Sequence, residues 1–159
     1  MTSRDNSDRK TAWVSASLTR DGYRTAISTR AHVVVTDEPR DVGGTDAGPT
    51  PYELLLGALA ACTAMTLRMY ADRKRWPLEE IVVRIRPVRS HAADCATCET
   101  EAVGVGRLER EVDLVGTLSE EQRERLLYMA DRCPVKQTLE RGLHVETAPV
   151  RTHSGVTPA

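Results

Sequence analysis

The apolar segment between residues 54 and 67, which contains no charged residue, limits the possible folds more than any other feature. Thr50 and Glu53 have the spacing of a capping box, and Pro51 suits the first helical position, so a helix is predicted to begin here. It is expected to end just before Pro77, because proline cannot continue a helix. A charge-free helix predicts burial on all sides. The segment is shorter than the about 20 apolar residues that a bilayer span needs, so a central core helix is expected.

Alternating apolar and polar residues on both sides of this helix predict antiparallel strands. The predicted strands are residues 13–19, 23–28, 32–36, 79–89, 106–116 and 143–150. Asp21-Gly22 is a typical hairpin turn between the first two strands. In the strand over residues 106–116, Leu108, Val112 and Leu114 are expected to face inward. The Gly- and Pro-rich segment over residues 37–50 predicts a long loop of functional importance, and the whole pattern predicts an α+β fold.

Chain length and composition predict one domain and a partner. The domain is expected over residues 11–150, between a disordered tail over residues 1–10 and a flexible tail over residues 151–159. The 159-residue chain has no phenylalanine, so its core must be aliphatic and thin, and a second copy is an expected partner. A net charge of -1 gives no reason to expect binding to nucleic acid or a membrane surface. Residues 1–10 lack the apolar region of a signal peptide, so a cytoplasmic location is expected.

A second helix begins at the capping box formed by Ser119 and Gln122. Helical spacing predicts that its buried face comprises Leu126, Met129, Ala130 and Cys133. Pro134 disfavours a helical conformation at Cys133, so Cys133 is expected to cap a third, short helix that ends at Gly142. A thiol at a helix N-terminus faces unpaired N–H groups, and its pKa is therefore expected to be lowered.

Four cysteines in a reducing compartment favour reactive thiols or metal ligands over structural disulfides. Cys62 lies in the apolar helix, where burial should raise its pKa and leave it inert unless a cation reaches it. A single buried cysteine is usually a small packing residue. Cys62 and Cys133, however, lie on the inward faces of the two longest predicted helices, and could meet as an attacking and a resolving thiol.

The motifs "GPTPYELLLGALAAC" and "ADRCPVKQTL" resemble those of the OsmC/Ohr family, the osmotically inducible and organic hydroperoxide resistance proteins. The resemblance extends from the first hairpin to the last predicted strand and is closest to an OsmC-like branch. It implies two core helices enclosed by antiparallel sheets that an intertwined homodimer completes. It also implies a peroxidase, in which Cys62 attacks an organic hydroperoxide to form a sulfenic acid and Cys133 resolves it. A dithiol reductant of unknown identity would then reopen the disulfide.

The resemblance further implies that an arginine of the first hairpin activates the attacking thiol, which assigns this role to Arg20, with Arg40 in the long loop as a substitute. Peroxidase members carry a glutamate where this chain has Tyr52. Glu53 points away from Cys62 on a straight helix and is expected to cap it instead. The alternative function is therefore a redox-sensing or zinc-stabilised dimer of the same fold that does not catalyse turnover.

His91, Cys95 and Cys98 follow an H-x3-C-x2-C order, which makes them candidate zinc ligands. A structural zinc site needs a fourth ligand, and Asp94, Glu99 or the second copy could supply it. The other interpretations are a mobile loop with two solvent-facing thiols, or a redox pair that reduces the disulfide between the two helices. No other cofactor is expected.

Overall fold

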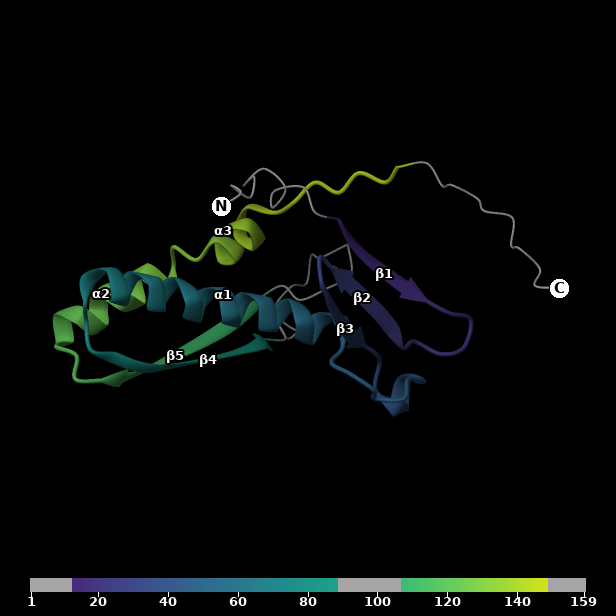
Figure 1. The fold of residues 1–159 in the computed structure, drawn as a ribbon, viewed down its shortest axis with the longest axis horizontal. Helices are drawn as coiled ribbons and strands as arrows, with labels where there is room; N and C mark the ends of the chain where they lie inside the picture. The colour runs from purple at the N-terminus through teal and green to yellow at the C-terminus, as the bar shows by residue number, and fades with distance from the viewer. Residues whose placement is uncertain (1–12, 89–106, 149–159) are drawn as a thin grey trace, which may run out of the picture.

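The fold of the computed structural model, which describes residues 13–88 and 107–148, is α+β (Figure 1). An N-terminal antiparallel sheet has the strand order β1-β2-β3. Its strands are β1 (Val14–Leu18), β2 (Thr25–Thr29) and β3 (His32–Thr36). Gly22 lies in the turn between β1 and β2 with a φ of 78°, a conformation that favours glycine. The predicted hairpin and third strand are confirmed.

The long helix α1 (Pro51–Lys74) follows the loop that contains a single 3-10 turn, η1 (Arg40–Val42). The predicted capping box is present: the Thr50 side chain accepts from the Glu53 N–H at 3.2 Å, and the Thr50 N–H donates to Glu53 Oε2 at 2.7 Å. The helix ends at Arg75, which adopts a left-handed conformation two residues before Pro77. The capping role predicted for Glu53 is therefore confirmed.

The second half of the chain forms a two-stranded antiparallel sheet with two helices. The elements are β4 (Leu78–Val88), β5 (Arg107–Gly116), α2 (Glu120–Ala130) and α3 (Pro134–Arg141). The capping box of Ser119 and Gln122 begins α2, and Cys133 is the N-cap of α3, as predicted. Helix α1 lies along the β4–β5 sheet and also packs against α2 and α3 (Figure 1).

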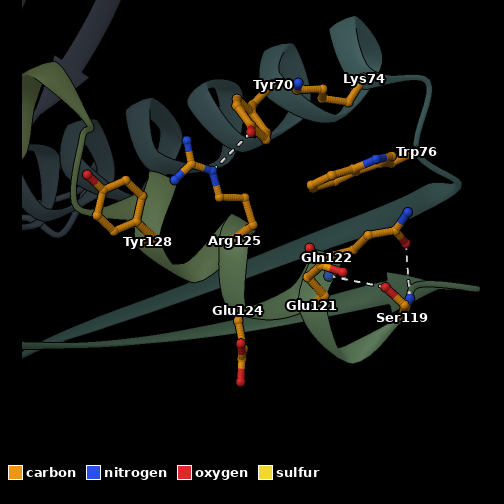
Figure 2. Close-up of a pocket in the computed structure, with 9 residues that line it drawn as sticks. All are labelled: Tyr70, Lys74, Trp76, Ser119, Glu121, Gln122, Glu124, Arg125 and Tyr128. Atoms are coloured by element: carbon orange, nitrogen blue, oxygen red, sulfur yellow. Dashed lines mark hydrogen bonds between the residues drawn. The ribbon is translucent and has the colours of Figure 1, made fainter.

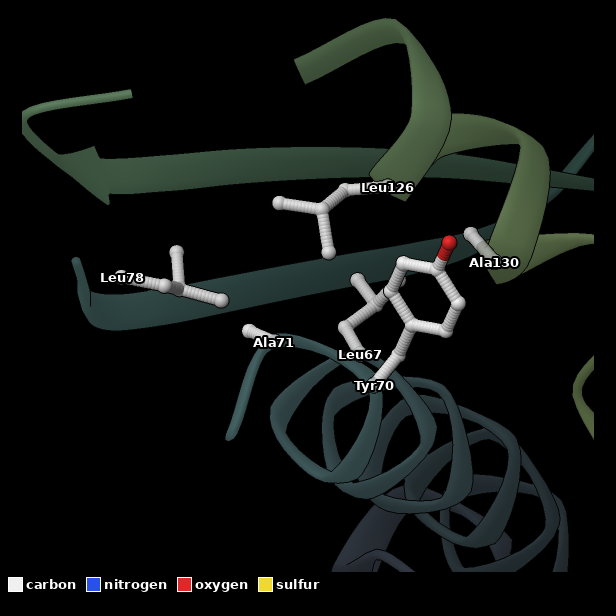
Figure 3. Packing of buried hydrophobic residues seen from close by; sticks show 6 residues of the cluster. All are labelled: Leu67, Tyr70, Ala71, Leu78, Leu126 and Ala130. Atoms are coloured by element: carbon white, nitrogen blue, oxygen red, sulfur yellow. The ribbon is translucent and has the colours of Figure 1, made fainter. Parts of the chain in front are cut away.

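The hydrophobic core lies where α1, β4 and α2 meet. Figure 3 shows the side chains of this cluster: Leu67, Tyr70, Ala71, Leu78, Leu126 and Ala130. Partly buried residues of β4 and β5 pack against it, including Ile81, Val112 and Leu114. All members of this cluster come from α1 and the elements that follow it, so the N-terminal sheet contributes nothing to this core.

The expectation that α1 is buried on all sides is wrong for the protomer. One face packs against the sheet, whereas Leu55, Met65 and Met69 are exposed. The reason is that the described elements that pack against the helix, β4, α2 and α3, leave part of its surface uncovered. The expectation from length was also incomplete: the 24-residue helix contains an 18-residue window with a mean hydropathy of 1.5, so it is long and apolar enough to cross a membrane by length and composition. The core helix of a soluble protein passes the same test, so this finding alone is weak evidence for a membrane span.

The predicted last strand is also wrong where the structure describes it. Residues 143–148 are irregular and exposed. An extended segment needs a neighbouring strand to bond its backbone, and the strands described in this protomer pair only as β1-β2-β3 and β4-β5. The predicted tails, residues 1–10 and 151–159, lie outside the described part of the chain.

Candidate active site

The structure brings Cys62 and Cys133 together. Cys62 lies on α1 and is partly exposed, and Cys133 lies at the start of α3 and is completely buried. Both are free thiols, and each perturbs the pKa of the other, so the two side chains lie next to each other. The neighbouring Cys133 raises the pKa of Cys62, whereas the neighbouring Cys62 lowers that of Cys133. The meeting of two thiols from different helices is the chemically most notable feature of the described residues.

The two thiols have opposite pKa shifts. Burial raises the pKa of Cys62, and the N–H of Val135 and the Thr66 side chain only partly offset it. Burial also acts to raise the pKa of Cys133, but the N–H of Lys136, the Cys62 thiol and the Thr63 side chain outweigh it, so that pKa is lowered. Both directions agree with the sequence prediction. In the reduced pair the negative charge therefore resides preferentially on Cys133.

An arginine of β5 contacts the elements that carry both thiols. Arg110 Nη1 donates to Thr63 Oγ1 at 3.3 Å and to the Ala130 carbonyl at 3.1 Å. Its Nη2 donates to Asp131 Oδ1 at 3.0 Å. Thr63 follows Cys62 in the sequence, and Ala130 and Asp131 lie within one turn of Cys133. Arg110 therefore holds the two thiol-bearing segments in register.

Sequence reasoning missed Arg110, although the signal was present. Along β5, Leu108, Arg110, Val112 and Leu114 lie on one side of the strand, and Arg110 pairs with Ile85 of β4. The alternation identified the three apolar residues as inward-facing and passed over the arginine between them. A cation at an inward position of a strand needs buried partners, and this requirement could have marked it.

The arginines proposed from the family resemblance lie elsewhere in the protomer. Arg20 is exposed in the turn between β1 and β2, and Figure 1 shows that this turn lies away from α3. Arg40 is exposed in η1. Tyr52, at the position of the family glutamate, is also exposed. Arg110, in contrast, bonds residues close to both thiols in the sequence, namely Thr63, Ala130 and Asp131.

A cavity of about 730 Å³ lies between α1, β5 and α3; neither thiol lines it, but Arg110 and residues one turn from each thiol do. Its apolar lining is Leu55, Leu56, Leu59, Leu108 and Leu139. Arg107, Arg110 and Lys136 add positive charge. Leu59 lies one helical turn before Thr63, and Lys136 lies in the first turn after Cys133, so an apolar molecule in this cavity would approach the thiols.

A second cavity of about 700 Å³ lies between the end of α1 and α2 (Figure 2). Arg125 Nε donates to the Tyr70 hydroxyl at 3.0 Å, and this bond lowers the pKa of Tyr70. The Arg125 guanidinium also lies 4.8 Å from the centre of the Tyr128 ring. These contacts tie α1 to α2, and the lining of this cavity includes none of the residues around Cys62 and Cys133.

The candidate zinc ligands His91, Cys95 and Cys98 lie outside the described residues. Within residues 13–88 and 107–148, no cluster of three or more His, Cys, Asp or Glu side chains could hold a metal ion.

A sequence profile of the family described as OsmC-like protein matches residues 44–148 of the chain. This match includes both Cys62 and Cys133. The comparison with curated proteins gives no match.

Solved structures show the same fold. An OsmC-like protein from Mycoplasma pneumoniae is 20% identical, with a TM-score of 0.66 over 82% of this chain and 87% of that one. An organic hydroperoxide resistance protein from Legionella pneumophila is 22% identical, with a TM-score of 0.51 over 80% and 87% of the two chains. An organic hydroperoxide resistance protein from Elizabethkingia anophelis is 16% identical, with a TM-score of 0.52 over 80% and 86%. At identities this low, the likeness establishes the fold.

Proposed function

Because this chain belongs to the OsmC-like protein family, we propose that it is a thiol-dependent peroxidase that reduces organic hydroperoxides. The observation that carries the proposal is the adjacent pair of free thiols, Cys62 and Cys133. Two proteins of similar fold are organic hydroperoxide resistance proteins, which supports a substrate of this class. The family match also confirms the resemblance identified from the two cysteine motifs.

Cys62 is the thiol that attacks in this proposal, because it is partly exposed whereas Cys133 is fully buried. Its sulfur attacks the terminal peroxide oxygen and the O–O bond breaks, which leaves a sulfenic acid on Cys62 and an alkoxide that takes up a proton to become the alcohol. The Cys133 thiolate then attacks the Cys62 sulfur, and the departing hydroxide takes up a proton to become water. A dithiol reductant supplies the two electrons that reopen the disulfide.

The cavity beside the thiols favours alkyl or lipid-like hydroperoxides over hydrogen peroxide. Its lining contains five leucines, and such a surface gains free energy from contact with an apolar chain. A small polar peroxide would leave most of that lining in contact with water.

We also propose that the protein acts as a cytoplasmic homodimer in which Arg20 of a second protomer approaches Cys62. Two features support this assembly: the exposed apolar face of α1, with Met65 and Met69, and the exposed strand β1. A guanidinium beside the Cys62 sulfur would stabilise its thiolate, because arginine stays protonated and donates several hydrogen bonds.

The proposal is tested by intact mass and thiol count before and after an equimolar addition of cumene hydroperoxide. A variant with Cys95→Ser and Cys98→Ser keeps these two other thiols out of the count. We expect the loss of two thiols per chain, a mass lower by two hydrogens and no added oxygen. An unchanged mass and thiol count after prolonged exposure would rule out the peroxidase function.

A redox-sensing dimer without turnover is the second candidate, and the raised pKa of Cys62 favours it because a protonated thiol attacks peroxide slowly. The two functions differ in repeated cycles. A peroxidase consumes many equivalents of hydroperoxide when a dithiol is present, whereas a sensor forms the disulfide once and is reduced slowly.

A further inference from the structure

Arg110 is a cation held inside the protein beside the thiol pair. Its side chain is 16% exposed, and its ion-pair partner Asp131 is 63% exposed. Lys136 also contacts Asp131, at 3.4 Å, so this carboxylate is shared between two cations. Water screens an exposed carboxylate more strongly than it screens a partly buried guanidinium. The side of Arg110 that faces the protein interior therefore retains a positive potential.

Thr63 connects this charge to the thiols. Its hydroxyl is completely buried, accepts from Arg110 Nη1 at 3.3 Å and donates to the Leu59 carbonyl at 2.8 Å. The same hydroxyl also lies beside Cys133 and lowers the pKa of that thiol. A hydroxyl has a single proton, so it cannot donate to Leu59 and Cys133 at the same time. Arg110 Nη1 donates to the Thr63 oxygen, so the Thr63 hydroxyl proton can point either to the Leu59 carbonyl or to the Cys133 sulfur.

The groups around Cys133 come from every neighbouring element. Cys62 and Thr63 approach from α1, Arg110 from β5 through Thr63, and Asp131 lies just beyond α2. The N–H groups of Val135 and Lys136 approach from α3. Besides the two sulfurs, the titratable or charged side chains of this neighbourhood are Arg110, Asp131, Lys136 and Glu140, the last bonded to Lys136 at 2.6 Å.

We propose that Arg110 is a positioning residue of the thiol pair, which acts through Thr63 to hold the negative charge on Cys133, so that Cys133 serves first as the base for Cys62. The proposal rests on the peroxidase function proposed above. The Cys62 proton passes to the Cys133 sulfur as Cys62 attacks the peroxide, and Cys133 then gives it to the departing alkoxide. The regenerated Cys133 thiolate attacks the sulfenic acid, and the hydroxide released takes a proton from solvent.

The β5 arginine thus has a role separate from that of an arginine supplied by a second protomer. Arg110 sets where the charge of the reduced pair resides, whereas Arg20 would act on Cys62 only in the assembled dimer. Arg110 also fixes the Ala130 carbonyl and Asp131, which keeps Cys133 facing α1 when the disulfide must form.

The test compares Arg110→Met and Thr63→Val with Arg123→Met, in the full-length chain with Cys95→Ser and Cys98→Ser. Arg123 is a matched control, because it donates to the Leu114 and Gly116 carbonyls of the same strand and does not contact the thiol-bearing segments. The readout is the thiolate absorbance of the reduced protein as pH is raised. We expect Arg110→Met and Thr63→Val to raise the first midpoint by about one pH unit, and Arg123→Met to leave it unchanged.

Conservative variants separate positioning from folding. Thr63→Ser keeps the hydroxyl and should restore the midpoint of the unsubstituted protein, whereas Arg110→Lys keeps the charge but loses the planar fork and should restore it only in part. In a single turnover with cumene hydroperoxide, Arg110→Met should react about tenfold more slowly at neutral pH and recover at higher pH. A merely structural defect would slow the reaction equally at all pH values.

Failure of this proposal and failure of the proposed function would give different experimental results. An unchanged thiolate midpoint in folded Arg110→Met and Thr63→Val overturns the role of Arg110, whatever the peroxidase activity. If the unsubstituted protein does not react with the hydroperoxide, the peroxidase function fails, while the thiolate midpoints still decide whether Arg110 places the charge. If neither Arg110 variant folds, the comparison of Thr63→Val with Thr63→Ser decides it alone.

Discussion

The N-terminal sheet and the thiol-bearing region differ sharply in burial, although both contain apolar strands. In the region formed by α1, α2, α3 and the β4–β5 sheet, Leu67 and Leu126 are fully buried. In the N-terminal sheet every residue of β1 is exposed, and Val33 of β3 is 67% exposed. The first region has helices that cover a sheet, which is the usual way to bury an apolar face. The second has a sheet that packs mainly with its own strands, and none of the helices among the described residues covers it.

The contrast shows that the thiol-bearing region buries apolar side chains within one protomer, whereas the N-terminal sheet leaves its apolar side chains exposed. A small sheet gains stability from a packed apolar face, and without one it is marginal in water. The exposed face of α1 likewise has apolar side chains that nothing packs against among the described residues. A second copy that covers both surfaces would supply what each protomer lacks, and each prediction below tests how far the two regions depend on each other.

The largest expected effect is on the chemistry. Cys62→Ser should abolish hydroperoxide consumption, because a serine hydroxyl is not appreciably ionised and does not attack the O–O bond. Cys133→Ser should keep the first attack but leave Cys62 as a sulfenic acid, which excess peroxide drives to the sulfinic state. Mass spectrometry of the peptide that contains Cys62 distinguishes these products.

Arg20→Ala shows whether the N-terminal sheet takes part in that chemistry. If a second protomer brings Arg20 to Cys62, the variant should consume hydroperoxide at least about tenfold more slowly at neutral pH, with its fold unchanged. The matched control is Arg24→Ala, a substitution of an exposed residue at the other side of the same turn. Equal activity in both variants would place the chemistry entirely within the thiol-bearing region.

The next effect is on stability. Leu126→Ala should lower the free energy of unfolding by about 2–5 kcal/mol, because it leaves a cavity in a core that has little other material. Leu18→Ala, at an exposed position of β1, should cost under about 0.5 kcal/mol in an isolated protomer. Urea unfolding at several protein concentrations measures both.

The dependence of stability on protein concentration tests whether a second copy covers the N-terminal sheet. If a second copy covers the N-terminal sheet, the cost of Leu18→Ala should rise at protein concentrations that favour the dimer, and the stability of the unsubstituted protein should rise as well. Light scattering that shows a stable folded monomer at low concentration would contradict the prediction that a second copy must cover the N-terminal sheet.

Local sequence signals predicted the elements of both regions well. The capping boxes at Thr50 and Ser119 and the Pro-Gly boundaries of α3 act over a few residues, so a single sequence contains all the information needed. The order of the pKa values of Cys62 and Cys133 was also predicted, because it depends on a helix interior and a helix N-terminus.

The wrong or missed predictions concern features that depend on which distant segment packs against a helix or pairs with a strand. The all-apolar sequence of α1 predicts cover on every side, but it does not say whether the same chain provides that cover. The alternation over residues 143–150 predicts a strand, but only a neighbouring edge can pair it. Arg110 was missed because its partners, Thr63 and Asp131, are far away in the sequence.

A smaller effect concerns the loop that joins the two regions. Asp37 is buried, and its carboxylate accepts from the Thr45 hydroxyl at 2.6 Å and from the N–H groups of Glu38, Thr45 and Ala47. The hydroxyl bond is the main cause that lowers its pKa from 3.8 to about 2. Because the folded-state pKa is lowered, this contribution to stability is complete above about pH 4 and is lost as pH falls towards 2.

Asp37→Asn should therefore destabilise the protein at neutral pH, because the amide loses the charge and one acceptor oxygen. Thermal unfolding from pH 7 to pH 2 should show that the unsubstituted protein and the variant converge at the acidic end. Asp46→Asn, at an exposed position of the same loop, is the control and should change little. A constant difference between Asp37→Asn and the unsubstituted protein over this range would show that the charge is not the source of the stabilisation.

The smallest effect separates the two capping boxes. Thr50→Ala removes the cap of α1 at the junction with the loop, and Ser119→Ala removes the cap of α2 inside the thiol-bearing region. Each loses one side-chain acceptor for an N–H group, so each should cost about 1 kcal/mol in urea unfolding. If the loop only leads into the helix, the two costs should be equal. If Thr50 also secures the N-terminal sheet, Thr50→Ala should cost clearly more than Ser119→Ala, and hydrogen exchange should increase in β1, β2 and β3 while β4 and β5 stay protected. Equal costs together with unchanged exchange in the N-terminal strands would mean that the stability of that sheet does not depend on the start of α1.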